Sequence, residues 1–297
     1  MSNKNLMAAK RNKNDEFYTL YEDVASECSH YIEHFENKII YMNCDNPKYS
    51  NFWKYFKDNF HTLKLKKIIS TYYIENEQTY KTEFDGITET KTLLNGNGDF
   101  RSDECIEILK ESDLVITNPP FSLWRMFLSQ LMEYNKKFLI IGNLNAVSCK
   151  YVFECMKENK VYITSRRIRF FKQPDGSITK LGNGCWYSNL KSDERIQPLN
   201  LYKKYTPEEY PVYDDYNAIN CNKTKDIPCD YDGLIGVPVS FIEKYNPSQF
   251  ELIDLLSRYS IFDLQGTNEK IRNKRTHATC INGKALYSRL IIKPIKH

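Results

Sequence analysis

Short apolar runs alternate with stretches of helical spacing over the first two thirds of the chain, and this alternation constrains the fold most. Predicted strands occupy residues 38–44, 66–73, 113–117, 137–142 and 161–164. Predicted helices occupy residues 15–35, 51–60, 102–110, 123–134 and 152–159, and residues 75–98 suggest a surface strand pair. Strands joined through helices at this spacing pair in parallel. We therefore expect a doubly wound, mainly parallel α/β sheet.

The alternation stops after about Leu190, where polar, proline-bearing sequence with several acidic residues begins. Residues 1–14 are polar and basic, which is typical of a flexible tail. We expect three parts: a flexible basic tail over residues 1–14, the α/β domain over 15–190, and a smaller α+β appendage over 191–297.

Composition excludes several classes of protein. No apolar run in the 297 residues approaches the length of a membrane span, and no signal peptide precedes the first elements, so we expect a soluble, intracellular protein. Nine cysteines include no C-x-x-C pair, and the five histidines are scattered. This pattern argues against a zinc ribbon, a disulfide framework and any metal site.

The tetrapeptide Asn118-Pro-Pro-Phe121 follows directly on the apolar run 113–117. Pro119 keeps Asn118 out of the helical region, and neither proline has an N–H, so the backbone there offers mainly carbonyl acceptors. The Asn118 side-chain oxygen and the Pro119 carbonyl would each accept one N–H of an exocyclic amine, while Phe121 stacks on the ring. A Pro-Pro turn that merely closes the strand is the alternative. The position favours a ligand site, because α/β folds bind ligands at the carboxyl ends of their strands.

Three further segments are candidates for small-molecule binding. Asp45-Asn-Pro47 ends the first predicted strand, where a carboxylate would meet amino or hydroxyl groups of a ligand, although the same residues also favour a turn or a helix cap. Gly96-Asn-Gly-Asp-Phe100 allows close backbone approach, and a hairpin turn is its alternative. Phe17-Tyr-Thr19 would cover a ligand or, as the residues alone favour, staple the first helix.

Basic residues gather in two stretches although the net charge is only +4. Residues 160–180 carry six lysines and arginines against one acid, with Phe170 and Phe171 between them, and residues 270–297 carry eight without an acid. Basic side chains beside aromatic rings suit a surface that follows a phosphate backbone. A solvated face is the alternative, but the segregation of charge favours nucleic-acid binding.

The chain resembles amino-methyltransferases that use S-adenosylmethionine and carry a [DNS]-P-P-[YFW] motif. It resembles most closely the EcoRI-type adenine-specific DNA methyltransferases, because their characteristic segments occur in the same order along nearly the whole chain. These segments are Asn14–Thr19, Tyr41–Pro47, Ser50–Phe56, Asn118–Phe121, Gly236–Phe241 and Tyr245–Phe250.

The resemblance implies a Rossmann-like methyltransferase domain over residues 15–190, and a region over 191–297 that contacts DNA or recognises its target. It implies a catalytic loop made of Asn118, Pro119, Pro120 and Phe121. The residues implied to bind the cofactor S-adenosylmethionine are Phe17, Tyr18, Thr19, Asp45, Pro47, Asp99 and Phe100. The residues expected to contact double-stranded DNA are Arg166, Arg167, Arg169, Lys172, Arg272, Lys274 and Arg275.

The implied reaction is methyl transfer to the N6 amine of an adenine that is flipped out of the duplex. The resemblance also implies a cytoplasmic monomer from a bacterial, phage or plasmid-borne context, with a possible cognate restriction endonuclease. Methylation of an RNA base or of a protein glutamine amide is an alternative, as is a non-catalytic DNA-binding protein with a decayed cofactor site. The last alternative arises because Asn46–Ser50 stands where methyltransferases have a glycine-rich loop. Glu75 and Glu77 are both candidates for the acidic residue that methyltransferases usually have after the second strand, and the sequence does not choose between them.

Overall fold

The computed structural model describes residues 18–172, 176–191, 197–256, 259–260, 271–272 and 279–295. The predicted tail over residues 1–14 and Phe17 lie outside these ranges. The chain divides into two compact units. The first contains residues up to Asn143 together with Arg166–Lys191, and the second contains Leu144–Ser165 together with residues from 192 on.

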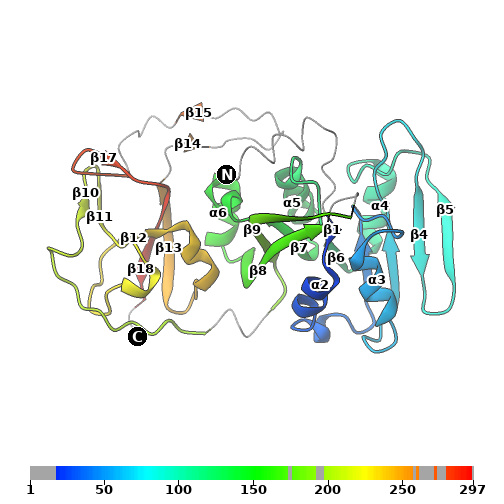
Figure 1. Ribbon diagram of the computed structural model, residues 1–297, viewed down its shortest axis with the longest axis horizontal. Helices are drawn as coiled ribbons and strands as arrows, with labels where there is room; N and C mark the ends of the chain where they lie inside the picture. The colour runs from blue at the N-terminus through cyan, green and yellow to red at the C-terminus, as the bar shows by residue number, and fades with distance from the viewer. Residues whose placement is uncertain are drawn as a thin grey trace. The chain divides into compact units, whose positions relative to one another are not determined.

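The first unit is built on a nine-stranded sheet of order β1-β8-β9-β7-β6-β2-β3-β4-β5 (Figure 1). Its central strands are parallel: β7 (Lys137–Asn143), β6 (Leu114–Thr117), β2 (Ile39–Met42) and β3 (Lys67–Ser70). The remaining strands are β1 (Tyr18–Thr19), β4 (Tyr80–Phe84), β5 (Glu89–Leu93), β8 (Tyr162–Lys172) and β9 (Ile178–Ser188).

The sheet is mixed, so the expected parallel arrangement holds only for the four central strands. β4 pairs antiparallel with β3 and with β5, β9 pairs antiparallel with β7, and β1 pairs antiparallel with β8. The predicted surface strand pair is β4 and β5. Strands joined by a short turn, as β4 and β5 are, lie antiparallel, whereas parallel neighbours need a crossover connection.

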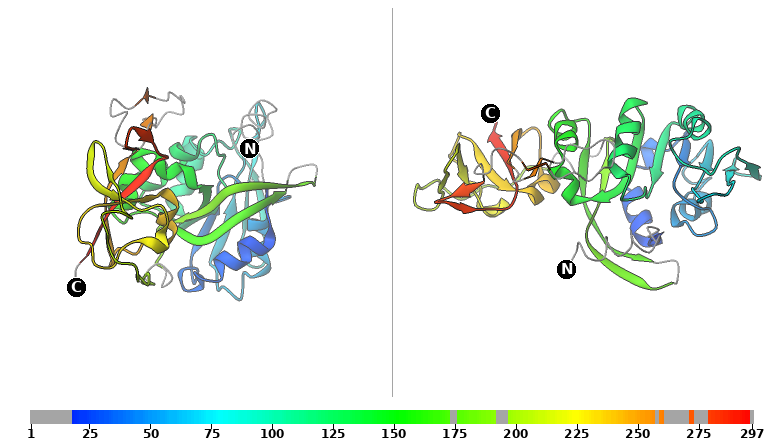
Figure 2. Two further views of the ribbon diagram at one scale, coloured as in Figure 1. Left: turned by 60° about the vertical axis from the view of Figure 1, so that its left-hand side comes forward. Right: turned by 90° about the horizontal axis from the view of Figure 1, so that it is seen from above.

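Helices cover both faces of this sheet, as the view from above in Figure 2 shows. They are α2 (Tyr21–Cys28), α3 (Asn51–Asp58), α4 (Asp103–Glu111) and α5 (Trp124–Glu133). Alternate residues of β2 point to opposite faces. Ile40 and Met42 belong to the core that contains Phe52 of α3, whereas the Tyr41 hydroxyl lies 2.7 Å from Thr71 Oγ1, which the Cys105 thiol of α4 also contacts.

The prediction of one helix over residues 15–35 is wrong. Tyr18 and Thr19 form β1, which pairs with Lys172 and Phe171 of β8, and the helix α2 is followed by a separate 3₁₀ turn, η1 (Ile32–His34). Pairing with a strand about 150 residues away overrides the local preference there. β8 is also longer than the strand expected at 161–164. The prediction stopped short because the charged outer half of β8 has no apolar pattern.

The second unit contains η2 (Leu144–Ser148), α6 (Lys150–Lys157) and a five-stranded sheet of order β10-β11-β12-β18-β13. The strands are β10 (Val212–Tyr213), β11 (Tyr216–Asn220), β12 (Ile235–Pro238), β13 (Phe250–Leu256) and β18 (Arg289–Pro294). Only β11 and β12 are parallel neighbours. Shorter elements are η4 (Thr224–Asp226), η5 (Val239–Lys244), β14 (Tyr259–Ser260), β15 (Ile271–Arg272), β16 (Cys280–Ile281) and β17 (Lys284–Ala285).

Candidate functional site

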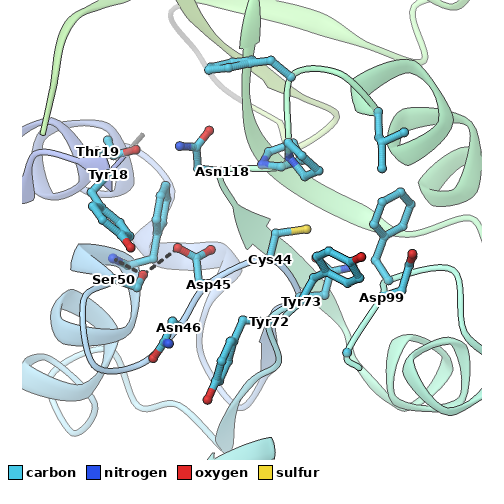
Figure 3. Close-up of a pocket in the computed structure, with 18 of the residues that line it drawn as sticks. Tyr18, Thr19, Cys44, Asp45, Asn46, Ser50, Tyr72, Tyr73, Asp99 and Asn118 are labelled. Atoms are coloured by element: carbon cyan, nitrogen blue, oxygen red, sulfur yellow. Dashed lines mark hydrogen bonds between the residues drawn. The ribbon is translucent and has the colours of Figure 1, made fainter. Parts of the chain in front are cut away.

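A cavity of about 360 Å³ lies in the first unit, at the carboxyl ends of β2, β3 and β6 (Figure 3). Parallel strands bring their carboxyl ends to one edge of a sheet, which is where α/β folds bind ligands. The volume falls in the range of small-molecule sites, about 300–1,000 Å³. The cavity is lined by Tyr18–Thr19, Asn43–Asn46, Ser50–Phe52, Tyr72–Tyr73, Gly98–Arg101 and Asn118–Leu123.

Asp45 holds the elements around this cavity together. Ser50, the N-cap of α3, donates to Asp45 Oδ1 at 2.7 Å (Figure 3), and the Thr117 hydroxyl donates to Oδ2. The backbone N–H of Asn118 donates to the same carboxylate. The Ser50 hydroxyl in turn accepts from the N–H groups of Phe52 and Trp53. The Asp45 carboxylate therefore links the N-cap of α3 to the end of β6.

The Asp45 carboxyl is buried and has no cationic partner among these contacts. Burial raises its pKa to about 6, although the bonds from Ser50, Thr117 and Asn118 lower it. A carboxylate that only neutral donors hold in a buried place is ready to interact with a positive charge brought by a ligand.

Asp99, at the other end of the cavity, has a different environment. Arg101 donates to it from Nε at 2.9 Å and from Nη2 at 2.5 Å. Partial burial alone would raise the pKa of Asp99, but these bonds outweigh burial and hold the pKa below its usual value. The preceding residue must be glycine: Gly98 has a φ of +73°, and a Cβ there would lie 2.1 Å from the Tyr72 carbonyl oxygen.

The Asn118–Phe121 loop joins β6 to α5 and opens on the cavity. The Leu123 N–H donates to the Pro120 carbonyl at 3.0 Å, and the Trp124 indole N–H donates to the Ile141 carbonyl of β7 at 2.7 Å. Phe121 is half-buried and meets Phe171 of β8 edge to face, with ring centroids 6.2 Å apart. The loop is therefore fixed at both ends.

The buried polar atoms on the cavity wall include two oxygens without a hydrogen-bond partner within the described part of the chain. They are Asn43 Oδ1, directly after β2, and Thr19 Oγ1, at the end of β1. Buried polar groups are almost always hydrogen-bonded, so a wall with two such atoms fits a ligand that carries polar groups.

Most of the small-molecule residues expected from the sequence meet at this cavity: Tyr18, Thr19, Asp45, Asp99, Phe100 and Asn118–Phe121. Pro47 does not line it and instead borders a neighbouring hollow with Lys48 and Tyr49. Phe17 is outside the described residues. Phe100 is also a core residue, since its ring packs on Phe127 with centroids 5.1 Å apart.

The sequence did not single out several residues of the wall: Asn43, Cys44, Asn51, Tyr72, Tyr73 and Arg101. Asn51 has a visible structural role, because its amide donates to the Thr19 carbonyl at 2.7 Å and so ties α3 to β1. The signal that would have found Asn43 and Tyr72 is their place at strand ends. Glu75 and Glu77 do not line the cavity.

The first basic stretch lies on β8, which with β9 extends as a two-stranded arm (Figure 2, green). Arg169 and Lys172 are exposed, as is 44% of Phe170. Arg166 and Arg167 are half-buried, and Arg166 lies 3.7 Å from the buried Glu27. Arg272 lies in β15, but its side chain is outside the description, as are Lys274 and Arg275 entirely.

Over the described ranges, the chain has neither a cluster of metal ligands nor a membrane-spanning helix. No cluster of histidine, cysteine or carboxylate side chains there would hold a metal ion. No helix in the described residues has the length and apolar character that crossing a membrane requires.

Known proteins resemble this chain over nearly its whole length. Residues 5–295 match the family described as adenine-specific methyltransferase EcoRI. The type II methyltransferase M.EcoRI of Escherichia coli is 42% identical, over 98% of this chain and 97% of that protein. The type II methyltransferases M.MgeORF184P of Mycoplasma genitalium and M.MpnI of Mycoplasma pneumoniae are 39% and 36% identical, each over 96% of this chain. No solved structure matches significantly.

Proposed function

The chain belongs to the EcoRI family of adenine-specific methyltransferases, and on that premise we propose that its cavity binds S-adenosylmethionine beside a flipped-out adenine. Family membership makes the protein a type II adenine-specific DNA methyltransferase of the restriction–modification kind. The observation that carries the proposal is the opening of the Asn118–Phe121 loop onto the cavity that Asp45 and Asp99 line.

The lining residues fit S-adenosylmethionine in size and chemistry. When bound, it supplies a methyl group on a positively charged sulfonium. We assign the neighbourhood of that charge to Asp45, whose pKa of about 6 leaves the carboxyl mostly ionised at neutral pH. The unpartnered oxygens of Asn43 and Thr19 would accept from the amino or hydroxyl groups of the cofactor. Asp99, Phe100 and the close approach at Gly98 would enclose its adenine.

The catalytic loop acts on the adenine of the DNA. The N6 amine is a poor nucleophile because its lone pair is delocalised into the ring. We assign its two N–H groups to the Asn118 side-chain oxygen and the Pro119 carbonyl, since the Pro120 carbonyl already accepts from Leu123. These acceptors favour a pyramidal nitrogen and stabilise the positive charge that develops on it. Phe121 would stack on the flipped ring.

Contacts to the DNA backbone are assigned to the β8–β9 arm and to the second unit. Arg166, Arg167, Arg169 and Lys172 follow one strand of the arm, which suits a phosphate-tracking surface. The same role for Arg272, Lys274 and Arg275, a cognate endonuclease, a monomeric state and a cytoplasmic location stay predictions of the sequence.

Radioactive methyl-labelled S-adenosylmethionine offered with duplex DNA, RNA and protein acceptors tests this function. We expect label only in DNA, recovered as N6-methyladenine after digestion to nucleosides. Label in RNA, in protein or in cytosine would contradict the proposal. Calorimetric titration with the cofactor alone tests the binding step by itself, and a folded protein that bound none would have a decayed site.

A further inference from the structure

One arginine is buried at the start of an inner strand of the second unit's sheet. Arg289 opens β18, where it pairs with Pro238 at the end of β12 and Leu256 at the end of β13, and it is only 8% exposed. Among the residues whose side chains the structure describes, it is the one buried lysine or arginine. Residues of this kind are almost never buried unless they are paired, so its partners need an explanation.

Every acceptor that the described residues give its guanidinium is a neutral oxygen. Nε donates to Asn220 Oδ1 and Nη2 to Asn222 Oδ1, both at 3.3 Å. Nη1 donates to the carbonyls of Tyr287 and Ser288 at 3.2 and 3.4 Å. Bonds from a guanidinium to a carboxylate or phosphate are about 2.7–2.9 Å long. The contacts of Arg289 are longer, and none of the described residues supplies an anion to its buried charge, which is a costly arrangement.

The two asparagines are themselves held in place. The Tyr213 hydroxyl donates to Asn220 Oδ1 at 2.8 Å, and the Asn220 amide donates to Asn222 Oδ1 at 3.1 Å. Tyr213 reaches this position because residue 236 is glycine: a Cβ there would lie 2.1 Å from the Tyr213 hydroxyl oxygen. Three side chains, from β10, β11 and the loop after β11, thus fix the guanidinium of Arg289 in one orientation.

The cluster is open to solvent on one side. Asn222 and Lys223 are exposed, and Tyr287 is 90% exposed. Arginine, lysine, asparagine and tyrosine side chains are the usual donors to DNA phosphates. We propose that Arg289, with Asn222 and Lys223, binds a backbone phosphate of the DNA substrate. This inference rests on the proposed function, in which the second unit contacts DNA.

The substitution Asn222→Asp separates this proposal from a purely structural role. It gives Arg289 the carboxylate that it lacks, so the folded protein should be as stable as before or more stable. The same carboxylate would compete with a phosphate. Thr224→Asp is the matched control, because it adds the same charge two residues along the chain, at the start of η4, and Thr224 is not among the residues that accept from the guanidinium. Arg289→Met, which removes the charge at similar length, is the second variant.

The affinity of the full-length protein for duplex DNA is measured as a function of salt concentration. One duplex contains the sequence that the protein methylates, and the other has an unrelated sequence. For Asn222→Asp and Arg289→Met we expect binding to both duplexes that is about tenfold weaker than for Thr224→Asp. The slope of log affinity against log salt concentration should be smaller in magnitude by about one, because one phosphate contact is lost. Unfolding temperature and S-adenosylmethionine affinity should stay near those of the parent for Asn222→Asp.

Three results would overturn the inference. The first is an unchanged salt slope with a raised unfolding temperature, which means that Arg289 only stabilises the fold. The second is a loss confined to the specific duplex, which means a base contact. The third is equal loss in Asn222→Asp and Thr224→Asp, which means general repulsion. Failure of the proposed function is seen separately, as a parent protein that binds no cofactor or does not methylate DNA.

Discussion

The two carboxylates that line the cavity differ in almost every physical respect. Asp45 is buried among hydroxyl and amide donors, and burial raises its pKa to about 6. Asp99 is partly exposed, and the hydrogen bonds from Arg101 keep its pKa below the usual value in spite of partial burial. The charge of Asp99 is thus balanced by Arg101, whereas Asp45 has no cationic partner among its contacts with the described residues.

The two ends of the cavity therefore offer a ligand different environments. At the Asp45 end the protein keeps a negative charge near the Asn118–Phe121 loop. A cationic sulfonium bound there would stabilise the ionised form of Asp45. At the Asp99 end the neutralised carboxylate serves as a hydrogen-bond acceptor for an uncharged ring. The four predictions that follow test one end against the other.

The largest effect is expected for Asn118→Ala, next to Asp45. The change removes one of the two acceptors for the adenine amine, and loss of one such preorganised group costs about 10²–10³-fold in kcat. Single-turnover methylation measures the loss, and cofactor titration should give an unchanged Kd. Asn95→Ala, at an exposed position outside the cavity, is the control. Turnover within a few-fold of the parent would remove Asn118 from the mechanism.

Asp45→Asn should alter how stability depends on pH. Because burial raises the folded-state pKa above its usual 3.8, Asp45 contributes stability that is fully present below about pH 4 and lost as pH rises through about 6. The difference between the two pKa values corresponds to about 3 kcal/mol. Chemical denaturation of parent and variant from pH 4 to 8 measures it. A free-energy difference between them that stays constant over this range would refute the assigned environment.

Asp99→Asn should have a smaller effect. It keeps one oxygen acceptor but loses the charge that holds Arg101, so we expect S-adenosylmethionine to bind about tenfold more weakly, which is about 1.4 kcal/mol. Calorimetric titration at neutral pH measures the change. Glu77→Gln, which alters an acid outside the cavity, should change nothing. A greater loss for Glu77→Gln would contradict the assignment of Asp99 to the cofactor site.

Ser50→Ala should have the smallest effect. It removes the N-cap of α3 and one of the donors to Asp45, and loss of a cap typically costs about 1 kcal/mol of stability. Ser50→Thr keeps the hydroxyl and should restore most of that loss. Denaturant unfolding of the three proteins at pH 7 compares them. If alanine and threonine behaved alike, the cap would not hold the start of α3.

The sequence predicted the central sheet because its strands carry strong local signals. β2, β3, β6 and β7 are short β-branched runs separated by helical spacing, and they occur where expected. The Asn118–Phe121 loop was predicted for a similar reason, since two prolines after a strand leave few conformations. Local patterns are informative where the local structure is also the final structure.

Elements that depend on distant contacts were missed. β1 exists because Tyr18 and Thr19 pair with β8, and nothing near residue 18 indicates that partner. The network of Asp45 joins residues 72 positions apart. Pro47 was expected in the cavity because it lies two residues after Asp45. The chain turns away from the cavity at Pro47, before α3 begins.

The pH dependence of cofactor binding tests the central claim most directly, namely that Asp45 supplies the uncompensated charge of the cavity. Calorimetric titration of S-adenosylmethionine from pH 5 to 8 compares the parent protein with Asp45→Asn. We predict that the affinity of the parent is constant above about pH 7 and falls about tenfold per pH unit below about 6, as the carboxyl is protonated. The affinity of Asp45→Asn should be lower and flat. A flat profile for the parent, or an unchanged slope in Asp45→Asn, would contradict the account.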